Sequence, residues 1–130
     1  IQLHGSETNQ RIKEIKQRSK LKVIKTIQVK DETDIGLYKK YSDADYILYD
    51  TPSMEGSIEF PADLIHKLPK GENFALAGSI SESTIDNIAK LGVKFCDLSS
   101  KLETKLGIKD HKKIKKFMDK VKKINENTSF

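Results

Sequence analysis

The sequence has few of the features that mark secreted, membrane-spanning or metal-binding proteins. Its single cysteine, Cys96, cannot form an internal disulfide, which fits a reducing compartment. No apolar run approaches the roughly 20 residues that cross a bilayer, and no signal peptide opens the chain. No group of residues demands a metal. We therefore expect a soluble, cytoplasmic protein that has no cofactor and no membrane partner.

Arginine is also scarce, and this limits what the net charge of +5 can mean. Residues 101–130 hold ten lysines against four acidic residues, so the positive charge gathers at the end of the chain. Only Arg11 and Arg18 supply guanidinium groups, which usually read guanine edges and bind phosphates in a bidentate manner. A lysine-rich helix face is more often simply solvated. We expect no nucleic-acid partner.

What the sequence does contain is a regular alternation of short apolar runs and helix-like segments. The apolar runs predict strands over residues 1–5, 21–29, 46–50, 74–77 and 93–98. The segments that follow them predict helices over residues 6–19, 31–41, 61–68, 81–91 and 110–124. Strict alternation of this kind is typical of parallel βα units in an α/β protein.

Two α/β architectures fit this order, an open doubly wound sheet and part of a (β/α)8 barrel. No Gly-x-Gly-x-x-Gly follows any predicted strand, which counts against a dinucleotide-binding fold. The periodicity alone does not choose between the two. With 130 residues, of which 36% are hydrophobic, we expect one domain with a lean core over residues 1–124 and a frayed tail over residues 125–130.

The third predicted strand, residues 46–50, ends abruptly in the carboxylate of Asp50 and the hydroxyl of Thr51. In α/β proteins the carboxyl ends of strands display catalytic and binding groups, because the sheet holds them rigidly at the rim of a crevice. Asp50 is therefore the first candidate for a catalytic residue. The alternative is that Asp50 only caps the turn that follows.

Six sequence blocks resemble phosphoribosylanthranilate isomerase, the tryptophan-pathway enzyme, in the order that this family has them. The blocks are Ile1-Gln2-Leu3-His4-Gly5 with Glu7, Val23-Ile24-Lys25, Ile47-Leu48-Tyr49-Asp50-Thr51, Leu76-Ala77-Gly78 with Ile80, Asp97-Leu98-Ser99-Ser100 with Leu102-Glu103, and Gly107-Ile108-Lys109-Asp110. The resemblance implies a partial TIM barrel, from the fourth strand to the eighth helix, with a parallel sheet.

The resemblance also implies a reaction, the Amadori rearrangement of a phosphorylated small molecule, N-(5'-phosphoribosyl)anthranilate. Asp50 would be the general acid, and burial would have to raise its pKa to keep it protonated near neutral pH. His4 and Asp97 would line the site. The substrate phosphate would lie at the loops after the last two strands, on the positions Gly78, Ser79, Ser99, Ser100 and Lys101.

Several features depart from the family pattern. The family's Lys-Ile-Cys-Gly motif, whose cysteine is the general base, and the arginine that engages the substrate carboxylate have no counterpart in these 130 residues. Cys96 should point away from the side that Asp97 faces, because side chains alternate along a strand, and we interpret it as a packing residue.

Glycines of the family are replaced as well. Its paired glycines appear as Gly78-Ser79, its Ser-Gly as Ser100-Lys101, and the glycine-rich loop after Thr51 is reduced to Gly56-Ser57. A side chain at such a position removes the freedom for positive φ or for close approach of the backbone to phosphate.

Three functional hypotheses follow. The first is a truncated relative of the isomerase that is inactive alone. The second is the C-terminal half of an active isomerase, completed by an N-terminal segment or a separate chain. The third is a non-catalytic module that binds a phosphorylated ligand or a partner protein. Because five strands of a barrel leave open edges, we also expect self-association or pairing with a missing barrel segment.

Overall fold

The computed structural model describes residues 1–51, 60–78, 80–93 and 95–128. Five strands form the central sheet, namely β1 (Gln2–Leu3), β2 (Ile24–Gln28), β3 (Tyr46–Asp50), β4 (Phe74–Leu76) and β5 (Phe95–Cys96). Helices separate and follow them, namely α1 (Asn9–Ser19), α2 (Glu32–Ile35) with the 3-10 helix η1 (Gly36–Lys40), α3 (Ala62–Ile65), α4 (Ile85–Lys90) and α5 (His111–Thr128). The predicted α/β alternation is confirmed.

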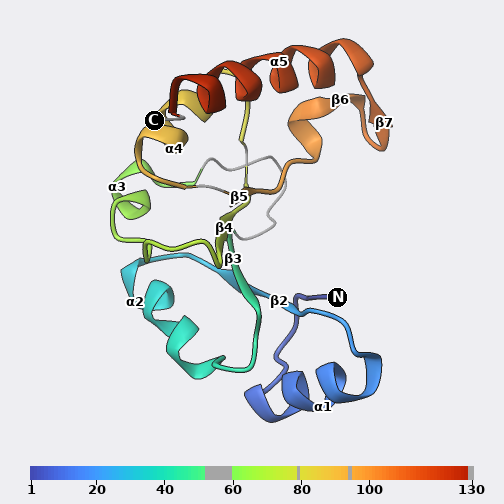
Figure 1. Ribbon diagram of the computed structural model, residues 1–130, viewed down its shortest axis with the longest axis vertical. Coiled ribbons are helices and arrows are strands. Elements are labelled where there is room, and N and C mark those ends of the chain that lie inside the picture. The colour runs from blue at the N-terminus through green and yellow to red at the C-terminus, as the bar shows by residue number, and fades with distance from the viewer. Residues whose placement is uncertain (52–59, 79, 94, 129–130) are drawn as a thin grey trace.

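The sheet is parallel throughout, and its strands lie in sequence order, β1-β2-β3-β4-β5. A doubly wound sheet needs a reversal of strand order, which the described strands do not have. The open doubly wound alternative is therefore wrong. Because each βα unit adds its strand on the same side of the last, α1 and α5 lie at opposite ends of the molecule (Figure 1).

The two faces of the sheet differ because side chains alternate along each strand. On β3, Ile47 and Tyr49 face the helices and belong to the main buried cluster, together with Leu76 of β4 and Phe117 of α5. Leu48 faces the other way and packs with small side chains of β4. This second face, here called the inner face, also carries Asp50 at the end of β3. Because Ile47 and Tyr49 are buried against the helices, Asp50 must lie on the inner face.

Two predicted boundaries are corrected. Helix α5 runs to Thr128, beyond the end predicted at residue 124, because Ile124 packs against the core and anchors the last turns. Helix α4 begins only at Ile85, because a turn comes first in which the Ser81 amide donates to Thr84 Oγ1 at 3.0 Å.

None of the described helices is long and apolar enough to cross a bilayer.

A small hairpin precedes α5 and was not predicted. It pairs β6 (Glu103–Lys105) with β7 (Ile108–Lys109) in antiparallel fashion and follows the 3-10 helix η2 (Ser100–Leu102). Gly107 turns the chain at a φ of +78°, which favours glycine. The hairpin lies beside the start of α5 (Figure 1).

An ion pair between a buried lysine and a partly exposed glutamate joins the first two βα units. The side chain of Lys25 on β2 is only 2% exposed, and its Nζ lies 2.8 Å from Glu7 Oε2. The same ammonium donates to the carbonyl oxygen of Gly5 at 2.5 Å and lies 5.3 Å from the ring centre of Tyr41. The hydrogen bond from Lys25 is the main cause that lowers the pKa of Glu7. A buried ammonium needs this carboxylate, since an unpaired charge in the interior is costly.

Gly78, directly beyond β4, is held in a conformation that other residues resist. Its φ is +90°, and a Cβ built on it would lie 2.6 Å from Thr51 Oγ1 and 3.3 Å from Asp50 Oδ1. The backbone at Gly78 therefore lies so close to the end of β3 that there is no room for a side chain. Gly92 has a similar φ of +82° but open space around it.

We predict that Glu7→Gln lowers the free energy of unfolding by about 2 kcal/mol, because it leaves the Lys25 ammonium buried without a counter-charge. Lys25→Met removes the charge but keeps the stem, and should cost less. The folded-state pKa of Glu7 is lowered, so the pair stabilises above its ordinary pKa of 4.5, and the loss in Glu7→Gln should shrink as the pH falls through the folded value. Urea denaturation from pH 3 to 7 measures the free energy of unfolding of each variant. A larger loss of stability in Lys25→Met than in Glu7→Gln would contradict the prediction.

We predict that Gly78→Ala destabilises more than Gly92→Ala. Both substitutions place a Cβ at positive φ, which costs about 1 kcal/mol. Only Gly78→Ala also pushes against Thr51 and Asp50, which should bring its total to about 3 kcal/mol. Thermal and urea denaturation of the two variants give the comparison. Equal losses would mean that the close approach of Gly78 to Asp50 is absent in solution.

Candidate active site

The strands of the sheet bring several predicted site residues to one rim. Asp50 ends β3, Gly78 follows β4 and Asp97 follows β5, so all three lie at carboxyl ends of neighbouring parallel strands. Two backbone hydrogen bonds carry the pairing to this rim, from the Ala77 amide to the Tyr49 carbonyl (2.8 Å) and from the Asp97 amide to the Leu76 carbonyl (2.9 Å). Residues more than 40 positions apart in the sequence, such as Asp50 and Asp97, therefore share one edge.

Asp50 is half-buried, and burial is the main cause that raises the pKa of its carboxyl group. The nearby carboxylate of Asp97 raises this pKa further, whereas His4 and a hydrogen bond from the Thr51 amide lower it. That amide donates to Asp50 Oδ1 at 2.8 Å, which is the kind of local contact expected if Asp50 only held its own turn. Because burial outweighs it, a carboxyl group here holds its proton to higher pH than Asp does in water.

His4 and Asp97 are both exposed and lie near enough to Asp50 to affect its charge. His4 Nε2 lies 2.7 Å from Gln2 Nε2, and the same amide donates to Thr26 Oγ1 at 3.4 Å. Asp97 lines a cavity of about 220 Å³ on the inner face, together with Gln2 and Leu48. The structure thus brings Asp50, His4 and Asp97 to one rim.

The expected phosphate positions are only partly described. Gly78 lies against Asp50 and Thr51, as given above, whereas Ser79 and the Gly56-Ser57 loop lie outside the described residues. Ser99 and Ser100 are exposed and follow β5. These positions therefore flank the rim on which Asp50 lies, because β4 and β5 are neighbours in the sheet.

Lys101 stands where the family is expected to have glycine. Among the described residues other than glycine, only Lys20 has a positive φ, so the backbone at Lys101 does not use the freedom that glycine would give. Lys101 lies in η2, and its side chain is exposed. The replacement at position 101 therefore costs the backbone little.

The sequence did not reveal the contact that holds Ser99. Lys109 Nζ donates to the Ser99 carbonyl oxygen at 3.1 Å and to Ser99 Oγ at 3.0 Å, and it also lies 2.5 Å from Glu103 Oε1. This ion pair is the main cause that lowers the pKa of Glu103. The only sequence feature that pointed to this region was the Gly107-Ile108-Lys109-Asp110 block. The hairpin accounts for the contact, since β7 brings Lys109 back to the residues that follow β5.

Cys96 packs as predicted. Its side chain lies against the main buried cluster on the helix side of the sheet, opposite to the face of Asp97. Burial raises the pKa of its thiol to about 11, so it is protonated at neutral pH and cannot serve as a base there. In the described part of the chain, no group of three or more His, Cys, Asp or Glu residues is arranged to hold a metal ion.

Comparison with known proteins gives a consistent result. The sequence model of the family described as "PRAI: N-(5'phosphoribosyl)anthranilate (PRA) isomerase" matches residues 1–120. The chain is 35% identical over 133 residues to the N-(5'-phosphoribosyl)anthranilate isomerase of Bacillus mycoides, covering 97% of this chain and 62% of that protein. It is 31% identical over 130 residues to that of Agrobacterium fabrum, covering 93% of this chain and 59% of that protein.

Solved structures agree. The phosphoribosyl anthranilate isomerase of Thermotoga maritima superposes with a TM-score of 0.77 at 29% identity, covering 94% of this chain and 60% of that one. A structure of such an isomerase with reduced 1-(o-carboxyphenylamino)-1-deoxyribulose 5-phosphate gives 0.73 at 27% identity, covering 94% and 58%. The chain spans about 60% of the length of these relatives. The chain belongs to the N-(5'-phosphoribosyl)anthranilate isomerase family.

Proposed function

We propose that this chain supplies the acid side of the phosphoribosylanthranilate isomerase reaction, with Asp50 as the general acid. The observation that carries the proposal is the half-buried carboxyl group of Asp50, whose pKa is raised and which lies at the rim beside Gly78. A protonated acid is what the first step needs. The Amadori rearrangement opens the furanose ring, and the ring oxygen must receive a proton as its bond to C1 breaks.

The second step needs a base, and the cysteine that the family is expected to use, that of its Lys-Ile-Cys-Gly motif, has no counterpart in these 130 residues. After ring opening, the proton on C2 must leave so that the enol can form and become the ketone. Cys96 faces the helices with a raised pKa, and Asp97 is an exposed carboxyl group on the acid's own rim. We therefore propose that the base lies outside these 130 residues and that they do not turn over substrate alone.

The substrate phosphate would bind beside the ends of β4 and β5. Gly78 leaves its backbone open where a Cβ would fill the space, and Ser99 and Ser100 present hydroxyl groups on the next strand end. Lys109 holds Ser99 in place through two hydrogen bonds. Ser79 and Lys101 complete the proposed set, and His4 and Asp97 line the mouth of the site.

The fold would then be strands four to eight of a TIM barrel, with residues 1–124 as one domain that continues into the rest of α5. Sequential parallel strands support this, since a barrel adds βα units in one direction. Among the described residues, apolar side chains beside the inner face stay exposed, Phe95 to 44% and Ile1 to 45%. We propose that further βα units, from a segment or chain outside these residues, pair with the edges at β1 and β5.

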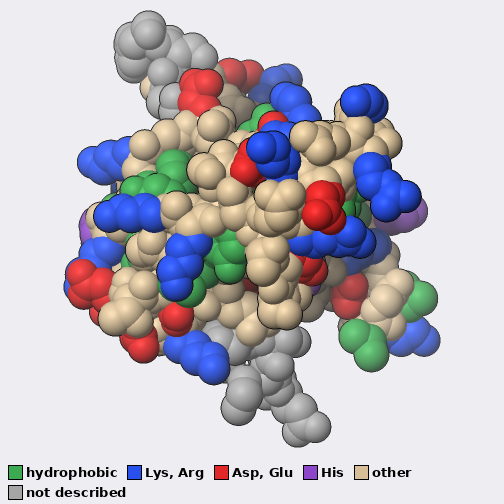
Figure 2. All heavy atoms as spheres, turned by 90° about the horizontal axis from the view of Figure 1, so that it is seen from below, with side chains coloured by type: hydrophobic (Ala, Val, Ile, Leu, Met, Phe, Trp, Pro, Cys, Tyr) green, Lys and Arg blue, Asp and Glu red, His purple; other side chains and the backbone are tan. Residues whose placement is uncertain are grey.

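The lysine-rich helix α5 is better explained as a solvated face than as a nucleic-acid site. At least four of its lysines are engaged in ion pairs, Lys115 with Asp119, Lys116 with Glu82, Lys120 with Asp86 and Lys122 with Glu126. Figure 2 views the molecule from the opposite end, where α1 lies in Figure 1, and on that face too Lys and Arg side chains are interspersed with Asp and Glu. A binding stripe would need cations without such partners.

We predict no conversion of N-(5'-phosphoribosyl)anthranilate by the 130 residues alone. Conversion should appear when the part of the Bacillus mycoides relative that this chain does not span is supplied, either fused to the chain or as a second chain. In that active form, Asp50→Asn should lower kcat by about 10² to 10⁴, because the amide cannot protonate the ring oxygen. The loss of substrate fluorescence measures the rate.

Asp97→Asn is the matched control, since it removes a carboxylate from the same rim. It should lower kcat by less than tenfold, because Asp97 affects the reaction only by shifting the pKa of Asp50. A larger effect in Asp97→Asn than in Asp50→Asn would overturn the assignment of the acid. Turnover by the 130 residues alone would contradict the proposal that the base lies outside them.

A further inference from the structure

Gln28, the last residue of β2, lies directly beside Asp50 in the sheet and has no role in the reaction as described so far. Parallel pairing of β2 with β3 sets Gln28 opposite Asp50, and the Val29 amide donates to the Asp50 carbonyl at 2.8 Å. Ile27 and Val29, on either side of Gln28, belong to the buried cluster beneath the helices. Because side chains alternate along a strand, Gln28 turns to the inner face, where it is exposed.

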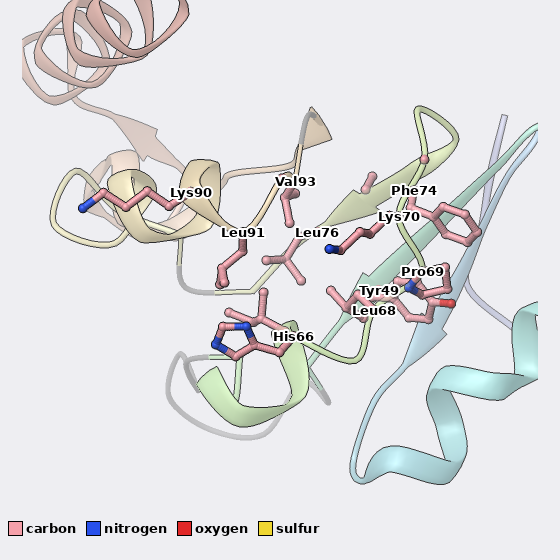
Figure 3. Close-up of a pocket in the computed structure, with 14 residues that line it drawn as sticks. Tyr49, His66, Leu68, Pro69, Lys70, Phe74, Leu76, Lys90, Leu91 and Val93 are labelled. Atoms are coloured by element: carbon pink, nitrogen blue, oxygen red, sulfur yellow. The ribbon is translucent and has the colours of Figure 1, made fainter. Parts of the chain in front are cut away.

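Asp50 lies on this face for the same reason. Tyr49, the residue before it, points to the helix side, where Figure 3 shows it beside Leu68 and Pro69 of the segment that leads into β4. Neighbouring strands lie about 4.8 Å apart, so the side chains of Asp50 and Gln28 leave the sheet side by side. Whatever meets the Asp50 carboxyl group therefore also comes within reach of Gln28.

The carboxamide group of Gln28 is available to a ligand. Within the described part of the chain, its side chain takes part in no hydrogen bond. Gln2, another amide on the inner face, is by contrast 2.7 Å from His4 Nε2 and donates to Thr26 Oγ1 at 3.4 Å. A carboxamide is neutral and can both donate and accept, as a sugar hydroxyl can. Gln28 thus offers a match for a hydroxyl group next to the acid.

The order of the strands indicates which part of a substrate Gln28 meets. The proposed phosphate site lies at the ends of β4 and β5, and Asp50 on β3 must meet the ring oxygen. The substrate therefore crosses the rim from β4 toward β2, and its ribose ring extends past Asp50 to Gln28. Glutamine has one more carbon than aspartate, so its amide stands higher above the sheet, level with the edge of a ring that rests on Asp50.

We propose that Gln28 is a specificity-determining residue that recognises the 3-hydroxyl group of the ribose by a hydrogen bond. This inference rests on the isomerase reaction proposed above. The 3-hydroxyl group takes no part in the bond changes, whereas the 2-hydroxyl group becomes the ketone. A hydrogen bond to the 3-hydroxyl group is therefore equally strong before and during the reaction, so it lowers KM and leaves kcat unchanged.

The test uses the active form, in which the part of the relative that this chain does not span is supplied. Condensing anthranilate with ribose 5-phosphate or with 3-deoxyribose 5-phosphate gives two substrates that differ only in the 3-hydroxyl group. For the complete substrate, Gln28→Met should raise KM about tenfold and change kcat by less than about twofold. For the 3-deoxy substrate, the same substitution should change KM by less than about twofold.

Thr26→Val is the matched control, because Thr26 lies on the same strand and face but is buried, two residues before Gln28. It should change KM for either substrate by less than about twofold. The proposal is overturned if Gln28→Met raises KM equally for both substrates, if it leaves KM for the complete substrate unchanged, or if it lowers kcat at unchanged KM.

Binding without turnover separates this proposal from the assignment of the acid. Ribose 5-phosphate and its 3-deoxy form are titrated into the same protein by calorimetry. Gln28→Met should weaken the binding of ribose 5-phosphate about tenfold and that of the 3-deoxy sugar by less than about twofold. If Asp50→Asn keeps its full kcat while this difference is present, the acid is wrong and the role of Gln28 stands. Equal binding of the two sugars by the unsubstituted protein overturns the role of Gln28 alone.

A further measurement tests the position of Gln28 in the 130-residue chain. Gln28→Glu places a carboxylate opposite Asp50 and should raise the pKa of the Asp50 carboxyl group in a ¹³C NMR titration, because two neighbouring negative charges disfavour each other. Gln17→Glu, at an exposed position of α1, should leave that pKa unchanged. The same Asp50 pKa in both variants would show that Gln28 does not lie beside the acid and would overturn the proposal.

Discussion

Parallel pairing of five strands in sequence order is the constraint on which the candidate site depends. Backbone hydrogen bonds fix β3 against β4 and β4 against β5, with Tyr49 opposite Leu76 and Leu76 opposite Cys96. Once this register is set, the next residue of β3, Asp50, must point to the inner face at the carboxyl rim. The positive φ of Gly78 then lets the neighbouring loop close against it. Site geometry is thus a consequence of sheet geometry.

Two ionisable groups in this fold illustrate opposite uses of burial. Lys25 is enclosed and paired with Glu7, so its charge serves to join β2 to the loop after β1. Asp50 is half-buried near another carboxylate, so burial works against its charge and raises its pKa. The first arrangement supports the fold, and the second makes the group able to hold a proton. Both lie within the residues that the isomerase family model matches, yet of the two only Asp50 lies at the carboxyl rim.

Patterns local in sequence predicted much of this structure. The apolar run before Asp50 gave the correct strand bounds, and the spacing of apolar residues in the last helix identified α5. Contacts between distant residues were not predictable in this way. Lys25 with Glu7 and Lys109 with Ser99 are separated by 18 and 10 residues, and the periodicity of the chain does not encode such pairs. The β6–β7 hairpin was missed because its strands are too short for an alternating pattern to appear.

The central claim is that Asp50 holds a proton more tightly than an ordinary aspartate, and its pKa in the folded chain tests this most directly. A ¹³C NMR titration of the Asp50 side-chain carboxyl group should give a pKa above the ordinary 3.8. In Asp97→Asn the value should fall but stay above 3.8, because burial, not the neighbouring charge, is the larger cause. A pKa at or below 3.8 in the unsubstituted chain would contradict the account, since Asp50 would then be an ordinary ionised turn residue.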